Sequence, residues 1–389
     1  MDVSDSPVIL RVEDLLDRGR AAALLQDYGD EWFLAPLSKL VQCINAEAGL
    51  VSTDAMAVQR IVQALSERLQ MVDLLKRRPE ILDEKVEVAG AILGLPRTGS
   101  TMMQRLLGSV PQLTSGFWWE VTFPLPFPGE QPGDPTPRKE AAKAAVEYFY
   151  SAWPEFRSIH PMDALAQDED VILLDKSFLS STYDSMLYIP SYGFWMPEQD
   201  HIKAYEELKV WLQILQDKTP WRRGRKWILK SPHHLIGGLD GFLKVFPDAK
   251  AIMTHRMIEE VLPSYCSMCA SLAAPNSPAL DAAKFGPFWL RRFSEAMERL
   301  EIVRTFEQPE RFIDVRYEDL IADPIGEGAR VRKALGVTPT EEDLAAMQEW
   351  YAANGRGARP PHHYVADNFG LTPEVMQKTF RNYHARYLA

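Results

Sequence analysis

A short apolar run that ends in a glycine-containing loop is the most informative segment of the sequence. Residues 86–95 are rich in small and β-branched side chains, as in a parallel strand that is buried on both faces. The loop at residues 94–101 reads Gly-Leu-Pro-Arg-Thr-Gly-Ser-Thr. Residues 101–110 then carry apolar side chains at helical spacing. The segment therefore predicts a strand, a tight loop and a helix in succession.

Strands and helices continue to alternate along the chain. Further strand-like runs occur at residues 227–229, 251–253 and 312–315, and a helical pattern follows each of them within a few residues. Helices are also expected over residues 141–152 and 202–216. Such alternation favours a P-loop NTPase-like α/β fold, in which helices flank a parallel sheet on both faces.

The first part of the chain is helical in pattern. Apolar residues such as Ile61, Leu65 and Leu69 fall on one face among polar and charged residues. No repeat or long linker divides the rest of the chain. We therefore expect residues 1–80 to form a helical N-terminal cap and residues 81–389 to form one α/β domain.

The composition excludes several classes of protein. With 46% hydrophobic and 25% charged residues, the chain is globular rather than disordered or fibrous. A net charge of −11 argues against binding nucleic acid or an anionic membrane through overall charge, so an anionic ligand needs a local site. There are too few cysteines for a disulfide framework, no signal-peptide pattern and no apolar run of membrane-spanning length. We expect a cytoplasmic protein.

The loop at residues 94–101 has the glycine spacing of a phosphate-binding P-loop. Glycine lets consecutive N–H groups point at phosphate oxygens, and the start of the following helix adds its positive dipole end. The lysine that contacts the β- and γ-phosphates of ATP in P-loops is replaced by Ser100, and a cation occurs earlier, at Arg97. The loop is therefore better suited to a 5′-phosphate than to ATP.

Four segments together resemble the cytosolic and Golgi sulfotransferases that use 3′-phosphoadenosine-5′-phosphosulfate (PAPS), in particular their bacterial branch. They are the loop at 95–101, the segment Trp-Ile-Leu-Lys-Ser-Pro-His-His-Leu at 227–235, residues 246–264 and the segment Val-Arg-Tyr-Glu-Asp-Leu at 315–320. The resemblance implies transfer of the sulfuryl group to an acceptor hydroxyl, with 3′-phosphoadenosine-5′-phosphate (PAP) as product and no metal requirement.

The resemblance also implies which residues bind the donor. In the family the loop holds the 5′-phosphate and the sulfuryl group, and the matching residues are Arg97, Thr98, Gly99, Ser100 and Thr101. An arginine at a strand end and a serine eight residues later hold the 3′-phosphate, and Arg256 and Ser264 match that spacing. Many relatives continue this arginine with Asp-Pro or Asn-Pro, whereas this chain has Met257 and Ile258.

The same resemblance suggests catalytic residues. Lys230, which ends the strand at 227–229, is expected near the bridging oxygen of the donor, with Arg97 as a second cation. Two alternatives remain for the general base that takes the acceptor proton. Glu120 follows the loop helix at a distance similar to that of the glutamate of tyrosylprotein sulfotransferases, and aromatic neighbours would raise its pKa. His233 or His234 is the rival, as in small-molecule sulfotransferases. We favour Glu120.

Aromatic side chains between these motifs are candidates for an acceptor pocket. Residues 116–136 are rich in proline and aromatics, which predicts a surface loop or pocket wall. Such walls suit a largely apolar alcohol or phenol. The candidates are Phe117, Trp118, Trp119, His160, Phe178, Tyr183, Tyr192 and Trp195, each of which could equally be a core residue.

The sequence also contains a C-x-x-C pair and a basic stretch near its end, and it leaves two alternative functions open. Cys266 and Cys269 form a C-x-x-C on the helix of Ser264, and we interpret them as packing residues. The basic stretch within residues 354–364 is interpreted as a loop that closes over the donor. The alternatives are a P-loop kinase that uses ATP and magnesium on a small molecule, and a nucleotide-binding regulator without turnover. The acceptor and the oligomeric state stay open.

Overall fold

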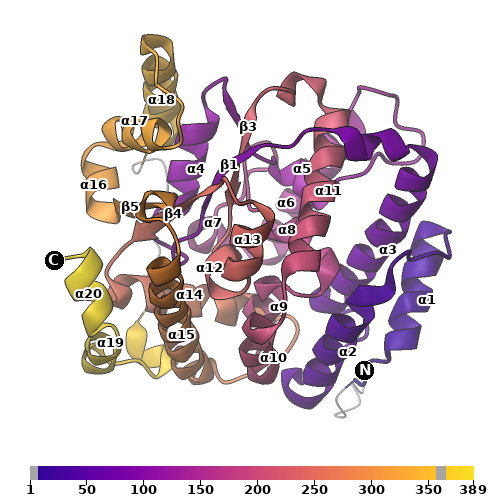
Figure 1. Cartoon of the computed structure of the whole chain (residues 1–389). Helices are drawn as coiled ribbons and strands as arrows, with labels where there is room; N and C mark the ends of the chain where they lie inside the picture. Colours follow the sequence, from indigo (N-terminus) through magenta and orange to yellow (C-terminus); the bar gives the residue numbers. More distant parts are fainter. Residues whose placement is uncertain (1–7, 356–364) are drawn as a thin grey trace.

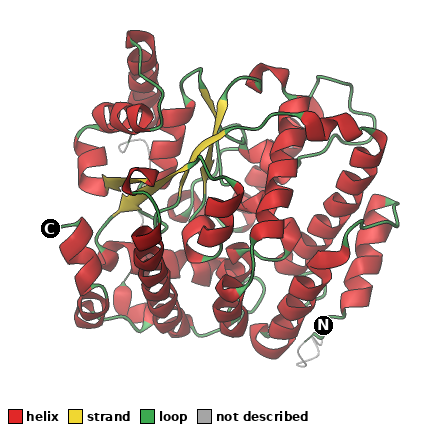
Figure 2. Ribbon diagram, viewed as in Figure 1, coloured by secondary structure: helices red, strands yellow, loops and turns green. Residues whose placement is uncertain are grey.

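A five-stranded parallel sheet with helices on both faces forms the centre of the protein (Figure 2). The computed structural model describes residues 8–355 and 365–389. The strand order is β2 (Leu113–Thr114), β3 (Lys226–Lys230), β1 (Val88–Ile92), β4 (Lys250–His255) and β5 (Phe312–Arg316). The α/β fold that the sequence predicts is confirmed.

Helices account for most of the remaining chain. Those before the sheet are α1 (Val12–Ala23), α2 (Leu34–Cys43) and α3 (Met56–Arg77). The others are α4 (Ser100–Gly108), α5 (Trp118–Thr122), α6 (Thr136–Ala152), α7 (Phe156–Ile159), α8 (Val171–Leu174), α9 (Ser181–Met186), α10 (Pro190–Trp195), α11 (Ile202–Lys218), α12 (His233–Ile236), α13 (Leu239–Val245), α14 (Ile258–Ala273), α15 (Phe285–Phe306), α16 (Tyr317–Ala322), α17 (Pro324–Ala334), α18 (Glu341–Asn354), α19 (Pro373–Thr379) and α20 (Arg381–Tyr387). Within the described residues, none of these helices combines the length and apolarity needed to cross a bilayer.

Successive side chains of the central strand face two different cores. Ala89 and Ile92 of β1 pack into a cluster with apolar residues of α4, α17 and α18, whereas Ala91 packs into the larger core on the opposite face. Both faces of the strand are therefore buried, which explains why the sequence shows a nearly continuous apolar run. The predicted runs at 227–229, 251–253 and 312–315 lie within β3, β4 and β5. The edge strand β2 was not predicted, because two residues carry no periodicity.

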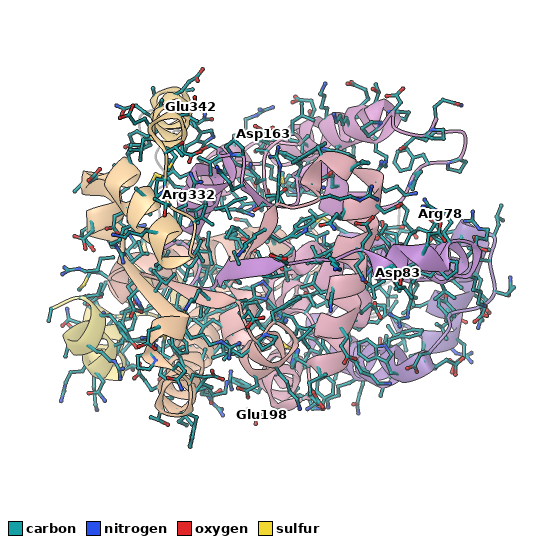
Figure 3. The ribbon with its side chains drawn as sticks, turned by 45° about the horizontal axis from the view of Figure 1, so that its top comes forward. Arg78, Asp83, Asp163, Glu198, Arg332 and Glu342 are labelled. Carbon is teal, nitrogen blue, oxygen red and sulfur yellow. The ribbon has the colours of Figure 1, made fainter. Side chains whose placement is uncertain are left out.

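The N-terminal helices α1, α2 and α3 lie together along one side of the molecule (Figure 1). The apolar face of α3 is buried in the same core as α11 and one face of the sheet. Arg68 of α3 donates a 2.6 Å hydrogen bond to Glu207 of α11, and both side chains are buried. Where α3 ends, Arg78 pairs with Asp217 of α11 at 3.0 Å (Figure 3 labels Arg78). Residues 8–80 thus consist mainly of helices joined by short loops, and their apolar side chains share one core with the α/β part.

The proline-rich segment at residues 116–136 is not entirely loop, because α5 interrupts it. The backbone N–H of Phe117 donates to the Glu120 carboxylate at 3.0 Å, which caps the first turn of this helix. The helices predicted at 141–152 and 202–216 correspond to α6 and α11, which are slightly longer. Elsewhere in the fold, Arg332 of α17 pairs with Asp343 of α18 at 2.9 Å, and both side chains are buried (Figure 3 labels Arg332).

Candidate functional site

The glycine loop follows the carboxyl end of the central strand. β1 pairs with β3 on one side and with β4 on the other, so the order in which strands are added to the sheet reverses at β1. In open parallel sheets such a topological switch point is where ligands bind. The ends of β1, β3 and β4 bring the loop, Lys230 and Arg256 to one edge of the sheet.

The loop conformation depends on close backbone packing. A Cβ at Gly94 would lie 2.4 Å from the Thr254 carbonyl oxygen, so no larger residue fits there. Gly99 has a φ of +88° and precedes α4 as its N-cap. The Thr98 hydroxyl lies 2.5 Å from the Leu95 carbonyl oxygen and 2.6 Å from the Thr254 hydroxyl. The Thr98 side chain therefore holds the loop against β4, just before α4 begins at Ser100.

The two predicted phosphate-binding elements are joined by hydrogen bonds. Arg97 of the loop donates from Nε to the Ser264 hydroxyl of α14 at 3.1 Å. Arg256, at the end of β4, donates to the Arg97 carbonyl oxygen at 3.1 Å. The Arg256 guanidinium also lies 4.1 Å from the centre of the Tyr317 ring and pairs with Glu260. One edge of the sheet therefore carries two guanidinium groups, a hydroxyl and a helix N-terminus.

The C-terminal helix α20 holds the backbone around Arg256. The Arg256 N–H donates to the Tyr383 hydroxyl at 3.1 Å, and that hydroxyl lies 3.2 Å from the Arg256 carbonyl oxygen. Two residues further on, the Ile258 N–H donates to Nε2 of His384 at 3.4 Å. These contacts fix the turn in which Met257 departs from the pattern of many relatives. Sequence reasoning missed Tyr383, because no motif marks it.

Lys230 ends β3 with its side chain almost fully buried, at 4% exposure. Its ammonium group pairs with Glu169, and the Ser231 hydroxyl lies 3.3 Å from the second oxygen of that carboxylate. The backbone N–H of Lys230 donates to Asp170 at 2.7 Å. Burial raises the pKa of the Glu169 carboxyl, although the charge of Lys230 opposes the rise. The acidic residues beside Lys230 were also missed, because short acidic runs are usually solvated surface.

Both candidate histidines are buried in contacts of their own. His234 pairs through Nε2 with Asp170 at 2.9 Å, and its Nδ1 lies 2.8 Å from the Tyr205 hydroxyl. His233 accepts a hydrogen bond at Nδ1 from the Ser181 N–H at 3.1 Å. Burial holds the pKa of His233 well below its usual value, so the ring is neutral. Since Nδ1 is the acceptor, Nε2 carries the proton and cannot receive another.

Glu120 is an ion-pair residue, and its contacts argue against the predicted role as general base. Its two oxygens accept hydrogen bonds of 2.8 and 2.6 Å from Arg222, and both side chains are buried. The same guanidinium donates to the Thr114 hydroxyl and the Ser115 carbonyl, which ties α5 to the end of β2. A carboxylate held in this way is an anchor of the fold rather than a group open to an acceptor.

The predicted acceptor aromatics separate into two groups. Phe117, Trp118 and Trp119 pack with residues of α6 and α7 into a small cluster, which also touches Met268 and Leu272 of α14. We call this the aromatic cluster. His160 directly follows α7 and is partly buried. Burial, together with the positive charges of Arg97 and Lys230, lowers the pKa of His160 to about 4, although the charge of Asp168 opposes the change.

The second group belongs to the main core rather than to a pocket wall. Phe178 is fully buried and packs against Phe33 of the N-terminal helical segment, with ring centres 5.9 Å apart. Tyr183 and Tyr192 are fully buried beside it, and Trp195 packs on Tyr192 at 6.0 Å. These four residues are therefore core residues and not the pocket wall that the sequence predicted, because the N-terminal helices cover the surface that they would have lined.

Comparisons with known proteins show to which family the chain belongs. Residues 91–342 match the sequence profile of the sulfotransferase family. The chain belongs to the sulfotransferase family. It is 30% identical over 180 residues to the omega-hydroxy-beta-dihydromenaquinone-9 sulfotransferase Stf3 of Mycobacterium bovis and of Mycobacterium tuberculosis. That match covers 44% of this chain and 43% of the relative, less than half of either.

Two solved sulfotransferase structures resemble the whole fold. The crystal structure of STF1 from Mycobacterium tuberculosis is 28% identical, with a TM-score of 0.84 over 97% of this chain and 100% of that one. The structure of STF9 from Mycobacterium avium is 25% identical, also with a TM-score of 0.84, over 100% of this chain and 98% of that one.

Three predictions from the sequence of this sulfotransferase concern the two cysteines of α14, the basic loop near residue 356 and metal binding. Cys266 and Cys269 are buried free cysteines on α14, as their interpretation as packing residues requires. The basic loop expected at 354–364 lies, from residue 356 onward, outside the described residues. Across residues 8–355 and 365–389, no group of three or more His, Cys, Asp and Glu side chains is arranged to hold a metal ion.

Proposed function

We propose that this sulfotransferase moves the sulfuryl group of PAPS to the hydroxyl of a small, largely apolar or aromatic acceptor. The observation that carries the proposal is the hydrogen-bonded chain from Arg256 through Arg97 to Ser264, with both links at 3.1 Å. A single nucleotide with phosphates at both ends would need two anion sites close together, and the proximity of Arg97, Arg256 and Ser264 supports this assignment. The loop also lacks the P-loop lysine that a kinase uses on ATP.

Each donor-binding group then has a chemical role. The N–H groups at the start of α4 would hold the 5′-phosphate and the sulfuryl group, and Arg256 with Ser264 would hold the 3′-phosphate. The Lys230 ammonium lies on the neighbouring strand, suited to stabilise the charge that develops on the leaving phosphate oxygen. Sulfuryl transfer passes in line between two oxygens, so positioning and these cations supply most of the catalysis.

One observation supports an apolar acceptor, and another supports an acceptor with a hydroxyl group. The aromatic cluster provides apolar surface, and its partner α14 also carries Ser264. The curated relatives are named for an omega-hydroxylated dihydromenaquinone, a molecule that bears a hydroxyl group. We infer that the acceptor of this chain approaches the loop from the aromatic cluster.

Ligand-induced stabilisation tests the donor. PAP without magnesium is expected to raise the melting temperature of the protein. At a hundredfold excess over its Kd, PAP should add about 2.7 kcal/mol to the free energy of unfolding. ATP with magnesium is expected to stabilise it less. Greater stabilisation by ATP would favour the kinase, and donor binding without transfer of labelled sulfuryl to alcohols, phenols or water would favour the regulator.

Replacing Tyr383 by phenylalanine is expected to weaken PAP binding about fivefold, while kcat at saturating donor stays unchanged. The Tyr383→Phe change removes the hydroxyl that bonds both backbone groups of Arg256, a loss of about 1 kcal/mol. Isothermal titration with PAP measures the effect. Tyr387→Phe is the matched control on the same helix, because its hydroxyl contacts Glu301 instead. Equal losses in both variants would mean that α20 acts only through stability.

A further inference from the structure

The acceptor hydroxyl must lose a proton, and the three residues expected to take it are already engaged. Arg222 holds both oxygens of Glu120. His234 lies between Asp170 and Tyr205, and His233 has its proton on the nitrogen that would have to accept one. A different base is therefore needed close to Lys230.

Glu169 occupies the position that such a base requires. Its carboxylate is 21% exposed, whereas the Lys230 side chain that it pairs with is only 4% exposed. One oxygen contacts the ammonium, and among residues 8–355 and 365–389 the other has only a long 3.3 Å contact with the Ser231 hydroxyl. Glu169 is thus a partly open carboxylate next to the cation expected at the leaving group, and its second oxygen is weakly engaged.

The chain just before Glu169 runs beside the aromatic cluster. Trp118 N–H and Trp119 N–H donate to the carbonyl oxygens of Ala166 and Ala164 at 2.9 and 3.1 Å. Asp168 N–H donates to the Gly116 carbonyl at 3.0 Å. This segment therefore leads from the surface proposed for the acceptor directly to the ammonium of Lys230.

We propose that Glu169 is the general base of the reaction, an inference that rests on the proposed sulfuryl transfer. The acceptor hydroxyl proton moves to the second carboxylate oxygen of Glu169, and the acceptor oxygen forms a bond to sulfur. The bond between sulfur and the 5′-phosphate oxygen breaks, and its electron pair stays on that oxygen as PAP forms. Every atom and charge comes from the acceptor, the donor and Glu169.

The Glu169–Lys230 pair also couples the two halves of the reaction. Protonation removes the negative charge that holds the Lys230 ammonium, just as negative charge develops on the leaving oxygen. Lys230 then stabilises the leaving group without a second negative partner. Burial raises the pKa of Glu169, which strengthens it as a base.

His160 is the competing base, and Glu169 is preferred because its carboxylate directly contacts the Lys230 ammonium. The pKa of His160 is lowered to about 4, so its conjugate acid is strong and the ring is a weak base. The charged and titratable groups around Glu169 are Lys230 of β3, Tyr265 of α14, and Asp168 and Asp170 on either side.

The test is Glu169→Gln, assayed by loss of labelled sulfuryl from PAPS with 2-naphthol, 1-dodecanol or water as acceptor. We expect kcat to fall about a hundredfold or more. The Kd for PAP should stay within about twofold, since Glu169 is not expected to touch either phosphate of PAP. In the wild type, activity should fall at low pH as Glu169 is protonated, and this acidic limb should disappear in the variant. Glu169→Asp, which keeps the carboxylate, should recover part of the rate.

Controls separate this proposal from folding and from the donor assignment. Glu84→Gln removes a carboxylate that is 12% exposed and contacts Arg223 and Gln216 rather than the loop, and it should keep full activity. Wild-type kcat in Glu169→Gln, or activity lost only in His160→Gln, would overturn the role of Glu169. If the wild type neither binds PAP nor releases labelled sulfuryl, the proposed function itself fails, whatever the variants do.

Discussion

Replacing Glu120 by alanine is expected to destabilise the fold by about 3–5 kcal/mol, with any loss of activity following from unfolding. The reason is the Arg222 guanidinium, whose side chain is 0% exposed and would lose its charged partner. A buried cation without a counter-ion costs more than the pair contributes, because the guanidinium stays desolvated. Urea unfolding of Glu120→Ala measures the change in the free energy of unfolding.

Two further variants show whether the lost charge pairing causes the effect. Glu147→Ala removes a carboxylate from an exposed pair with Arg157, and it should change stability by no more than about 0.5 kcal/mol. Glu120→Leu combined with Arg222→Met removes both charges and should recover most of the stability. Normal stability with abolished turnover in Glu120→Ala would instead return Glu120 to the chemical step.

The Arg256→Ala variant is expected to bind PAP about 10 to 100 times more weakly than the wild type. A guanidinium that contacts a phosphate contributes about 1.5–3 kcal/mol through charge-assisted hydrogen bonds. The substitution also removes the contact that joins β4 to the carbonyl of Arg97. Isothermal titration at a fixed salt concentration measures the change in Kd.

The matched control for this variant is Arg291→Ala. Both arginines pair with a glutamate four residues later, but Arg291 lies on the exposed face of α15. We expect the control to bind PAP normally. Equal affinities of Arg256→Ala and wild type would remove Arg256 from the donor site and leave the loop without its 3′-phosphate partner.

Local sequence patterns predicted most strands of the sheet and the glycine-containing loop. The apolar runs at 227–229 and 251–253 identify β3 and β4, because strands buried on both faces must be apolar throughout, and the run at 312–315, which alternates around the exposed Asp314, identifies the edge strand β5. Gly94 and Gly99 identify the loop, because one must pack against the Thr254 backbone and the other must adopt a positive φ. These requirements act on neighbouring residues, so they are visible in the sequence.

The environment of each polar side chain could not be predicted in the same way. Glu120 and Arg222 are 102 residues apart, and nothing local indicates that the first is neutralised by the second. Tyr383 reaches Arg256 across 127 residues, and Glu169 reaches Lys230 across 61. The availability of a carboxylate or imidazole for chemistry depends on such partners and on burial, which arise only when distant segments pack together.

Spacing and residue type alone were therefore enough to predict the parallel sheet, which the structure confirms, and to propose an anion-binding loop and a second phosphate site. Folding then brought Arg256 next to Arg97, covered Phe178 with the N-terminal helices and enclosed Glu120 with its counter-ion. The physical reason is that backbone conformation follows short-range sterics and periodicity, whereas desolvation and charge pairing depend on contacts between residues that are remote in the chain.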